Sequence, residues 1–243
     1  MKAGILYLHD AAALSRRPMT EMSNTDAAIA RRAPDAILGG ASGSDTAKRQ
    51  QIMEGARRVF LHDGFDGASV GDIVRAAGVS KGTLYAYFPS KEKLFEALII
   101  EDRLKQAEAL FTLDENEPDI VRVLRRLGRS FLDMLLSSDH LDFLRIVVGA
   151  STKFPQLGKV YFEAGPCNGA NRLACYLRRL TDEGVLFVED PQLAARQFLD
   201  LCKTGIHLRM MLGDCTAPAP KEIERNLDSA IKVFLAAYGR KQP

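Results

Sequence analysis

Residues 69–93, SVGDIVRAAGVSKGTLYAYFPSKEK, decide the fold of this chain. Ser69 followed three residues later by Asp72 forms a capping box, which predicts the start of a short helix. Gly78 predicts the end of that helix, because glycine readily adopts the left-handed conformation that often closes one. Ser80 is then positioned to cap a second short helix. A helix, a glycine-containing turn and a short helix are typical of a helix-turn-helix that reads DNA.

The outward side chains of the second short helix suit a surface that contacts DNA. Ammonium and hydroxyl groups bond phosphate oxygens and base edges, and glycine lets the backbone approach a base closely. The helix carries these groups at Lys81, Gly82, Thr83, Tyr85 and Tyr87. A plain helical hairpin with a polar surface is the alternative that this spacing alone leaves open.

Residues 48–98 resemble the DNA-binding domain of the TetR/AcrR family of bacterial transcriptional regulators. The resemblance departs from the family at Val74, where a small alanine is usual, and at Gly71, which is a weak helix former. We expect both to shift the helix slightly. The matching residues are Ile52, Ala56, Phe60, Gly64-Phe65, Ser69, Ile73, Ala77-Gly78-Val79-Ser80, Gly82-Thr83-Leu84-Tyr85, Tyr87-Phe88, Ser90-Lys91-Glu92 and Leu94.

This resemblance implies a homodimer that binds a palindromic operator in double-stranded DNA and is released by a small molecule. Two heads related by a two-fold axis can read half-sites about 34 Å apart. We expect Lys81 and Gly82 nearest the bases, with Tyr85 at a thymine methyl group or the backbone. The expected phosphate contacts are Thr83, Tyr87, Lys91 and the helix starts near Ser69 and Thr46.

The remaining sequence predicts further helices, so the expected fold class is all-α. The first helix should begin near Asp45-Thr46 and end at Asp63-Gly64, with Phe65 filling the small core. A connecting helix from Ser90 to about Phe111 follows the motif. The later helices are expected at 119–137, 139–151, 155–183, 190–212 and 220–239, and the segment 185–188 is a short strand or a loop.

These patterns predict three parts. The first is a flexible leader, 1–44, in which Met19 or Met22 could be the true start. There Arg31 and Arg32 could instead reach a minor groove beside the operator. The second is a TetR-type helix-turn-helix domain at 45–106, with the motif at about 69–88. The third is a helical ligand-binding and dimerisation domain at 107–243.

The segment from Phe143 to Leu212 is similar, less specifically, to the AefR-like C-terminal domains of the same family. The likeness rests on Phe154-Pro155-Gln156-Leu157, Phe162-Glu163-Ala164-Gly165-Pro166, Gly184-x-Leu186, Asp190-Pro191 and Ala194-Ala195-Arg196-Gln197-Phe198. Such domains vary greatly within the family, so the likeness supports a fold more than a ligand.

A ligand pocket is expected among the helices between about 90 and 184. Its candidate lining and polar anchors are Phe143, Phe154, Tyr161, Phe162, Asn168, Asn171 and Arg172. The alternatives are that the aromatic residues form core and that Arg172 is solvated. Gly165-Pro166 must kink or split the helix that contains it, and is a candidate hinge.

The dimer surface is expected on the last two long helices, at about 191–212 and 221–238. Their apolar stripes, which include Ile223, Leu227, Ile231, Phe234 and Leu235, could form a four-helix contact with the same helices of a partner. The alternative is that both stripes face their own core.

The composition fits an ordinary globular protein, with a formal net charge of +2. Between 45 and 93 there are eight Lys and Arg against six Asp and Glu, so DNA affinity must come from the placement of charge and from two copies. No run of about twenty apolar residues and no signal-peptide core occurs, which favours the cytoplasm. The four cysteines, Cys167, Cys175, Cys202 and Cys215, are expected to be reduced and buried, with a redox sensor as the alternative.

No catalytic constellation, cofactor motif or metal-ligand spacing is found. The four histidines, His9, His62, His140 and His207, stand in no metal-binding pattern, and no Gly-x-Ser-x-Gly or phosphate-loop motif occurs. We therefore expect no enzyme, no cofactor and no metal. A helical small-molecule binding module without a DNA role is the alternative to the regulator, and an enzyme is a third class.

Overall fold

The computed structural model describes residues 43–110, 117–214 and 217–240. Almost the whole expected leader, with Arg31 and Arg32, lies outside these ranges, as does Cys215. Residues 50–243 form one compact unit, and residues up to Arg49 are assigned to another.

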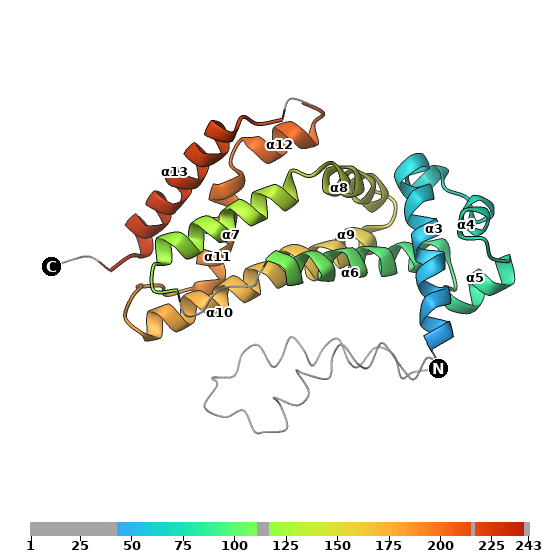
Figure 1. The fold of residues 1–243 in the computed structure, drawn as a ribbon, viewed down its shortest axis with the longest axis horizontal. Coiled ribbons are helices and arrows are strands. Elements are labelled where there is room, and N and C mark those ends of the chain that lie inside the picture. Colours follow the sequence, from blue (N-terminus) through green and yellow to red (C-terminus); the bar gives the residue numbers. More distant parts are fainter. Residues whose placement is uncertain (1–42, 111–116, 215–216, 241–243) are drawn as a thin grey trace, which may run out of the picture. The chain divides into compact units, whose positions relative to one another are not determined.

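The N-terminal helices follow the expected order. They are α3 (Gly43–Gly67), α4 (Val70–Ala77), α5 (Lys81–Tyr87) and the long α6 (Lys91–Leu110), which Figure 1 shows in blue to green. The helix α3 begins two residues before the expected start and leaves helical geometry at Gly64, where φ is 70° and ψ is 179°. The expected end of this helix is therefore confirmed.

The two helices of the motif are held by the caps that the sequence predicts. The Ser69 hydroxyl accepts from the Asp72 amide at 3.1 Å, and the Ser80 hydroxyl accepts from the Thr83 amide at 3.0 Å. At the end of α4, Gly78 adopts a left-handed conformation with φ of 63°. The amides of Gly78 and Val79 donate to Arg75 and Val74 carbonyls, which is the Schellman pattern. Because only glycine takes this conformation without strain, the turn is set locally.

Side chains of α3 donate hydrogen bonds to carbonyl groups at the end of α4. Gln51 donates to the Ala77 carbonyl at 2.7 Å, and Arg58 donates to the Ala76 carbonyl at 2.6 Å. Gly55 makes this approach possible, because a Cβ atom there would lie 2.6 Å from backbone atoms of Ala77. The position of α4 against α3 therefore depends on a missing side chain as well as on two hydrogen bonds.

The C-terminal part is also helical. Its helices are α7 (Ile120–Leu135), α8 (Ser138–Ser151), α9 (Pro155–Phe162), the π-helical turn η2 (Glu163–Cys167), α10 (Asn168–Asp182), α11 (Pro191–Lys203), α12 (Ile206–Met211) and α13 (Pro220–Tyr238). Within the described ranges the only β feature is an isolated bridge between Leu186 and Gly239. The expected all-α fold is confirmed.

One expected helix is wrong in length. The segment 190–212 is two helices, because Gly205 has φ of 74° and interrupts the helix between α11 and α12. Thr204 caps the break by donating to the Asp200 carbonyl at 3.0 Å, and Asn226 of α13 donates to the Thr204 carbonyl at 2.8 Å. The apolar pattern alone predicts a continuous helix here. The left-handed Gly205 and the hydrogen bond from Asn226 together end it.

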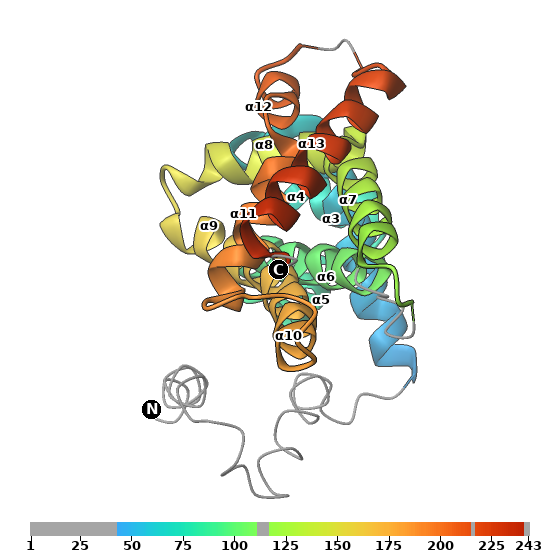
Figure 2. The ribbon, with the colours of Figure 1, turned by 90° about the vertical axis from the view of Figure 1, so that its left-hand side faces the viewer.

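Two apolar clusters hold the compact unit together. One lies among α7, α10, α11 and α13 and includes Phe198 and Phe234. Figures 1 and 2 both show α11 between α10 and α13. The other fills the helix-turn-helix head and continues into α8 and α9 through Phe143 and Leu157. Phe65 is buried there as expected, stacked near Phe60 and in contact with Phe95.

Candidate functional site

The recognition surface

The outward side of α5 presents Lys81, Gly82 and Tyr85, which are all exposed. The Lys81 side chain forms no hydrogen bond or ion pair with any residue that the structure describes, and Tyr85 is 49% exposed. The buried side of the same helix is fixed by Leu84, which is fully buried. The helix therefore holds a lysine and a tyrosine outward on a rigid support.

Several other residues expected to contact DNA already form hydrogen bonds or packing contacts within the protein. The Thr83 hydroxyl lies 2.8 Å from the Ser80 hydroxyl, and Ser69 donates to the Asp72 carboxylate at 2.5 Å. That hydrogen bond, with Arg75 as a lesser cause, lowers the pKa of Asp72. Tyr87 is half-buried against the core of the head. Thr46 is exposed near the start of α3.

Lys91 has a structural task that the sequence did not indicate. Its ammonium group donates to the carbonyls of Phe65 and Ala68 at 2.8 and 3.0 Å and lies 4.6 Å from the centre of the Phe65 ring. The first turn of α6 is thereby tied to the chain between α3 and α4. An ammonium group has three donors, so one donor is left for the expected phosphate contact.

The cavity in the C-terminal helices

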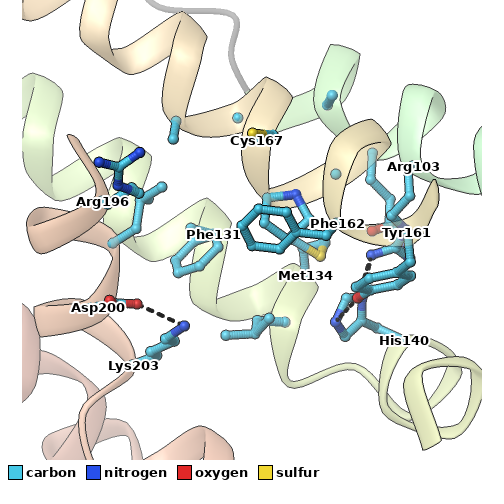
Figure 3. A pocket seen from close by; sticks show the side chains of 18 of the residues that line it. Arg103, Phe131, Met134, His140, Tyr161, Phe162, Cys167, Arg196, Asp200 and Lys203 are labelled. Carbon is cyan, nitrogen blue, oxygen red and sulfur yellow. Dashed lines mark hydrogen bonds and ion pairs between the residues drawn. The ribbon is translucent and has the colours of Figure 1, made fainter. Parts of the chain in front are cut away.

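A cavity of about 390 Å³, within the size range of small-molecule sites, is lined by α6 to α12 and by η2. Figure 3 shows Phe131, Met134 and Phe162 in its middle. Arg103, His140 and Tyr161 lie at one end, and Arg196 with the Asp200–Lys203 ion pair lies at the other. The lining is mainly apolar, with charged groups confined to the two ends.

The end at Arg103 is a buried polar cluster. Arg103 is 3% exposed, pairs with Asp102 and donates through Nη1 to His140 Nδ1 and to the Tyr161 hydroxyl, both at 3.1 Å. The Asp102 carboxylate also accepts a hydrogen bond from the guanidinium group of Arg57 in α3, at 2.8 Å. The cluster therefore runs from the cavity through α6 to the first helix of the head.

Charge and burial fix the protonation of this cluster. Burial alone would raise the pKa of Asp102, but Arg103 and Arg57 outweigh it and hold that pKa below its usual value. Burial, followed by the Arg103 and His207 charges, lowers the pKa of His140 to about 3. Burial also raises the pKa of Tyr161. At neutral pH the cluster contains an aspartate, two arginines, a neutral imidazole and a neutral phenol.

Three polar atoms of cavity residues lack a partner among the described residues. They are Arg103 Nε, Gln106 Oε1 and His207 Nε2. Buried polar groups are normally hydrogen-bonded, because an unmade bond costs about 1–3 kcal/mol. These atoms therefore mark the cavity as a place where a polar ligand group would be held.

The sequence located this cavity only in part. Of the expected lining residues, Tyr161, Phe162 and Asn171 lie on it. Phe143 and Phe154 instead pack with Phe95 and Phe65 in the core of the head, as the alternative allowed. Arg172 donates to the Ala107 carbonyl at 3.2 Å, and neither Arg172 nor Asn168 is part of the lining.

Arg103 and His140 were missed, although one signal was available. Asp102 and Arg103 continue the inward stripe of α6 formed by Leu94, Leu98 and Ile99. Charged residues on a buried helix face require a partner or a ligand, so their spacing could have identified them.

Gly165 and Pro166 lie beside the same cluster. They belong to η2, which joins α9 to α10 without a sharp break. A Cβ atom at Gly165 would lie 2.7 Å from Arg103 Cδ, so the Arg103 side chain packs directly against this turn. The expected kink is thus a π-helical turn shaped around Arg103.

Further corrections

The prediction that the apolar stripe of the last helix forms the dimer surface is wrong. Ile223, Leu227, Ile231 and Phe234 are at most 8% exposed and belong to the core of their own chain. Exposed apolar side chains on or beside these segments include Phe187, Leu193 and Val233, and also Leu208 and Leu212. The Phe187 amide donates to the Tyr238 carbonyl, which places Phe187 beside the end of α13.

The cysteines differ from one another. Cys202 is buried, whereas Cys167 is half-buried in the cavity lining and Cys175 is exposed. The expectation that the cysteines are buried is therefore correct for Cys202 and wrong for Cys175. Within the described part of the chain, no cluster of His, Cys, Asp and Glu is arranged to hold a metal ion. No helix in those ranges is long and apolar enough to span a membrane.

Relation to known proteins

The structure combines a capped helix-turn-helix, one long connecting helix and a helical domain with a cavity. The chain matches two family descriptions: "Bacterial regulatory proteins, tetR family" at residues 52–98 and "AefR-like transcriptional repressor, C-terminal domain" at 122–240. The chain belongs to the TetR family.

Individual relatives agree with this placement. The repressor AcnR of Corynebacterium efficiens is 41% identical over 98 residues, which cover 40% of this chain and 46% of the relative. The chain thus aligns with somewhat under half of AcnR. A transcriptional repressor of Mycobacterium tuberculosis is 29% identical over 69% of this chain and 84% of its own length.

Solved structures show the same architecture over most of the chain. A TetR-family regulator from Mesorhizobium loti superposes with a TM-score of 0.76 at 27% identity, covering 82% of this chain and all of the other. The flavonoid-responsive regulator FrrA superposes with a TM-score of 0.73 at 33% identity, covering 81% of this chain and all of FrrA.

Proposed function

We propose that this protein is a homodimeric repressor that binds a palindromic operator and is released from it by a small molecule. The observation that carries the proposal is α5, a helix held by local caps and by buried Leu84, with Lys81 unengaged and Tyr85 outward. A helix presented in this way can enter the major groove of DNA.

The roles of the recognition residues follow from their surroundings. Lys81 and Gly82 face the bases, because nothing in the described chain covers them. Tyr85 contacts a thymine methyl group or the backbone. The phosphate contacts are Thr83, Tyr87, Lys91 and the helix starts at Ser69 and near Thr46.

The cavity is the proposed effector site, and the buried cluster supplies a connection to the head. A ligand that moves Arg103 changes its pairing with Asp102, and Asp102 also holds Arg57 of α3. A ligand favouring one arrangement of this network biases the head between two positions. The name of FrrA indicates a response to flavonoids, which supports an aromatic body for the effector here.

The dimer contact is proposed on the outward side of the last helices, because their inward stripe is used by the core. Leu193 of α11 and Val233 of α13 are 43% and 49% exposed, and Phe187 beside the end of α13 is 72% exposed. Exposed apolar side chains on this side of the helices favour a subunit contact. We also propose that the protein is no enzyme and acts in the cytoplasm, since its relatives are named as transcriptional regulators.

The test is operator binding by the full chain at fixed salt, with DNA fragments upstream of its own gene and of the divergent neighbour. A preference for one fragment over random competitor is expected, together with a dimer in sedimentation analysis. Lys81→Ala should relax base preference, whereas Arg178→Ala, an exposed arginine of α10, should leave it unchanged. A monomer without preference would indicate a binding module without a DNA role.

A further inference from the structure

The inner end of the cavity carries an excess of positive charge. The guanidinium groups of Arg57 and Arg103 share the single carboxylate of Asp102. His140 and Tyr161 are neutral, and the Arg57 side chain is 34% exposed, so water solvates its charge. Arg103 is 3% exposed and shares the Asp102 carboxylate with Arg57, so the Arg103 charge is only partly offset. Because a buried charge is costly unless it is paired, a bound anion would stabilise Arg103.

The hydrogen bonds of the cluster leave two donors without a partner among the described residues, beside one acceptor, Gln106 Oε1, whose amide nitrogen donates to Asp102. Arginine can only donate, so His140 Nδ1, 3.1 Å from Arg103 Nη1, must be the acceptor. The His140 proton is then on Nε2, 3.4 Å from the Tyr161 oxygen. That oxygen accepts from both Arg103 and His140, so the Tyr161 proton is left to donate elsewhere. Arg103 Nε is a second donor without a partner in the described residues.

The walls between the two ends are apolar. Phe131, Met134, Leu135, Leu144, Phe162 and Leu199 line them. The outer end is less suited to an anion, because Lys203 is already paired with Asp200 at 2.8 Å and Arg196 is exposed. A charge-assisted hydrogen bond is stronger in the buried end than at a solvated rim.

We propose that the effector is an organic carboxylate with a mainly apolar body, whose carboxylate accepts hydrogen bonds from Arg103 Nε and the Tyr161 hydroxyl. The proposal rests on the proposed function only in treating the cavity as the effector site. Binding of the acid itself requires neither DNA nor a dimer.

The test is calorimetric titration of the full-length protein at pH 7 with two probes of equal shape, biphenyl-4-carboxylate and the neutral biphenyl-4-carboxamide. Because a hydrogen bond to a charged group contributes more than a neutral one, we expect the carboxylate to bind at least about 10-fold more tightly. Tyr161→Phe keeps the ring against which Arg103 stacks and should reduce this preference several-fold. Tyr238→Phe, whose hydroxyl bonds Gln197 outside the cavity, is the matched control.

Arg103→Lys keeps the charge but removes Nε–H and should also reduce the preference; circular dichroism checks that it folds. Equal affinity for the two probes, or no binding of either at 1 mM, overturns the proposal. The proposal is also overturned if Arg196→Gln loses the preference for the carboxylate while Tyr161→Phe keeps it. That result would place the bound anion at the outer end of the cavity. Failure of operator binding with the preference intact would instead refute the proposed function alone.

Discussion

The head and the cavity differ in whether their polar groups have hydrogen-bond partners within the chain. In the head, the caps of α4 and α5, the Schellman turn, Gln51, Arg58 and Lys91 satisfy backbone groups within the protein. In the cavity, Arg103 Nε, Gln106 Oε1 and His207 Nε2 have no partner among the described residues. The head satisfies these groups within the chain, which suits a rigid reader, whereas under the proposed function the cavity atoms are the ones that a ligand would engage.

The largest effect is expected where the head depends on close backbone approach. In Gly55→Ala the new methyl group would lie 2.6 Å from Ala77, so α3 and α4 must separate. Overpacking of this kind costs about 1–3 kcal/mol, which corresponds to a fall in Tm of about 2–12 °C for a protein of this size. We expect thermal unfolding to show this fall and gel shifts to show loss of operator binding.

The matched control for this change is Gly149→Ala. Gly149 is exposed in α8, and a Cβ atom there would meet nothing within 4 Å. This variant should be more stable by about 0.5–1 kcal/mol, because alanine favours a helix interior. Equal melting temperatures for the two variants would contradict the close packing of α3 and α4.

An intermediate effect is expected from the buried histidine of the cavity. The pKa of His140 falls on folding from 6.5 to about 3, so the unfolded chain binds its proton first as the pH drops below 6.5. Between pH 7 and pH 5 the free energy of unfolding should therefore decrease by about 2 kcal/mol from this group. Denaturant unfolding at a series of pH values measures the decrease.

The variant His140→Gln should remove most of this pH dependence, since glutamine can still accept from Arg103 and does not titrate. His62→Gln is the control, because the His62 side chain is 86% exposed. An unchanged slope in His140→Gln would mean that His140 is not buried in neutral form beside Arg103.

The smallest effect is expected at Lys91, where the two tasks of one side chain can be separated. Lys91→Ala leaves the carbonyls of Phe65 and Ala68 without their donor and should cost about 1–2 kcal/mol of stability. Loss of one phosphate contact should also weaken binding to all sequences alike and reduce the salt slope by about one unit. Urea unfolding and anisotropy titrations across a salt series measure the two effects.

Lys93→Ala provides the comparison, because the Lys93 side chain is 59% exposed and, among the described residues, its ammonium group pairs only with Glu96. It should change stability by less than Lys91→Ala does, because a solvated ammonium group contributes little to stability. If Lys91→Ala destabilises the head but keeps the full salt slope, Lys91 is a positioning residue and does not contact a phosphate.

The sequence by itself determined the elements whose signals are local. The caps at Ser69 and Ser80 and the turn at Gly78 involve residues within a few positions of one another, so their spacing predicts them. The inward stripe of α13 was also found correctly, but the sequence could not tell whether its partner was the same chain or another. Burial of Phe234 at 1% exposure shows that it is the same chain.

Only the tertiary structure decided where distant side chains meet. Phe143 and Phe154 were candidates for the pocket lining, yet they complete the core of the head, because α8 and α9 pack against it. Arg57, Asp102, Arg103 and His140 come from three helices and form one buried cluster. A helical period gives the face on which a residue lies, but contacts across helices depend on how those faces pack, which no local pattern specifies.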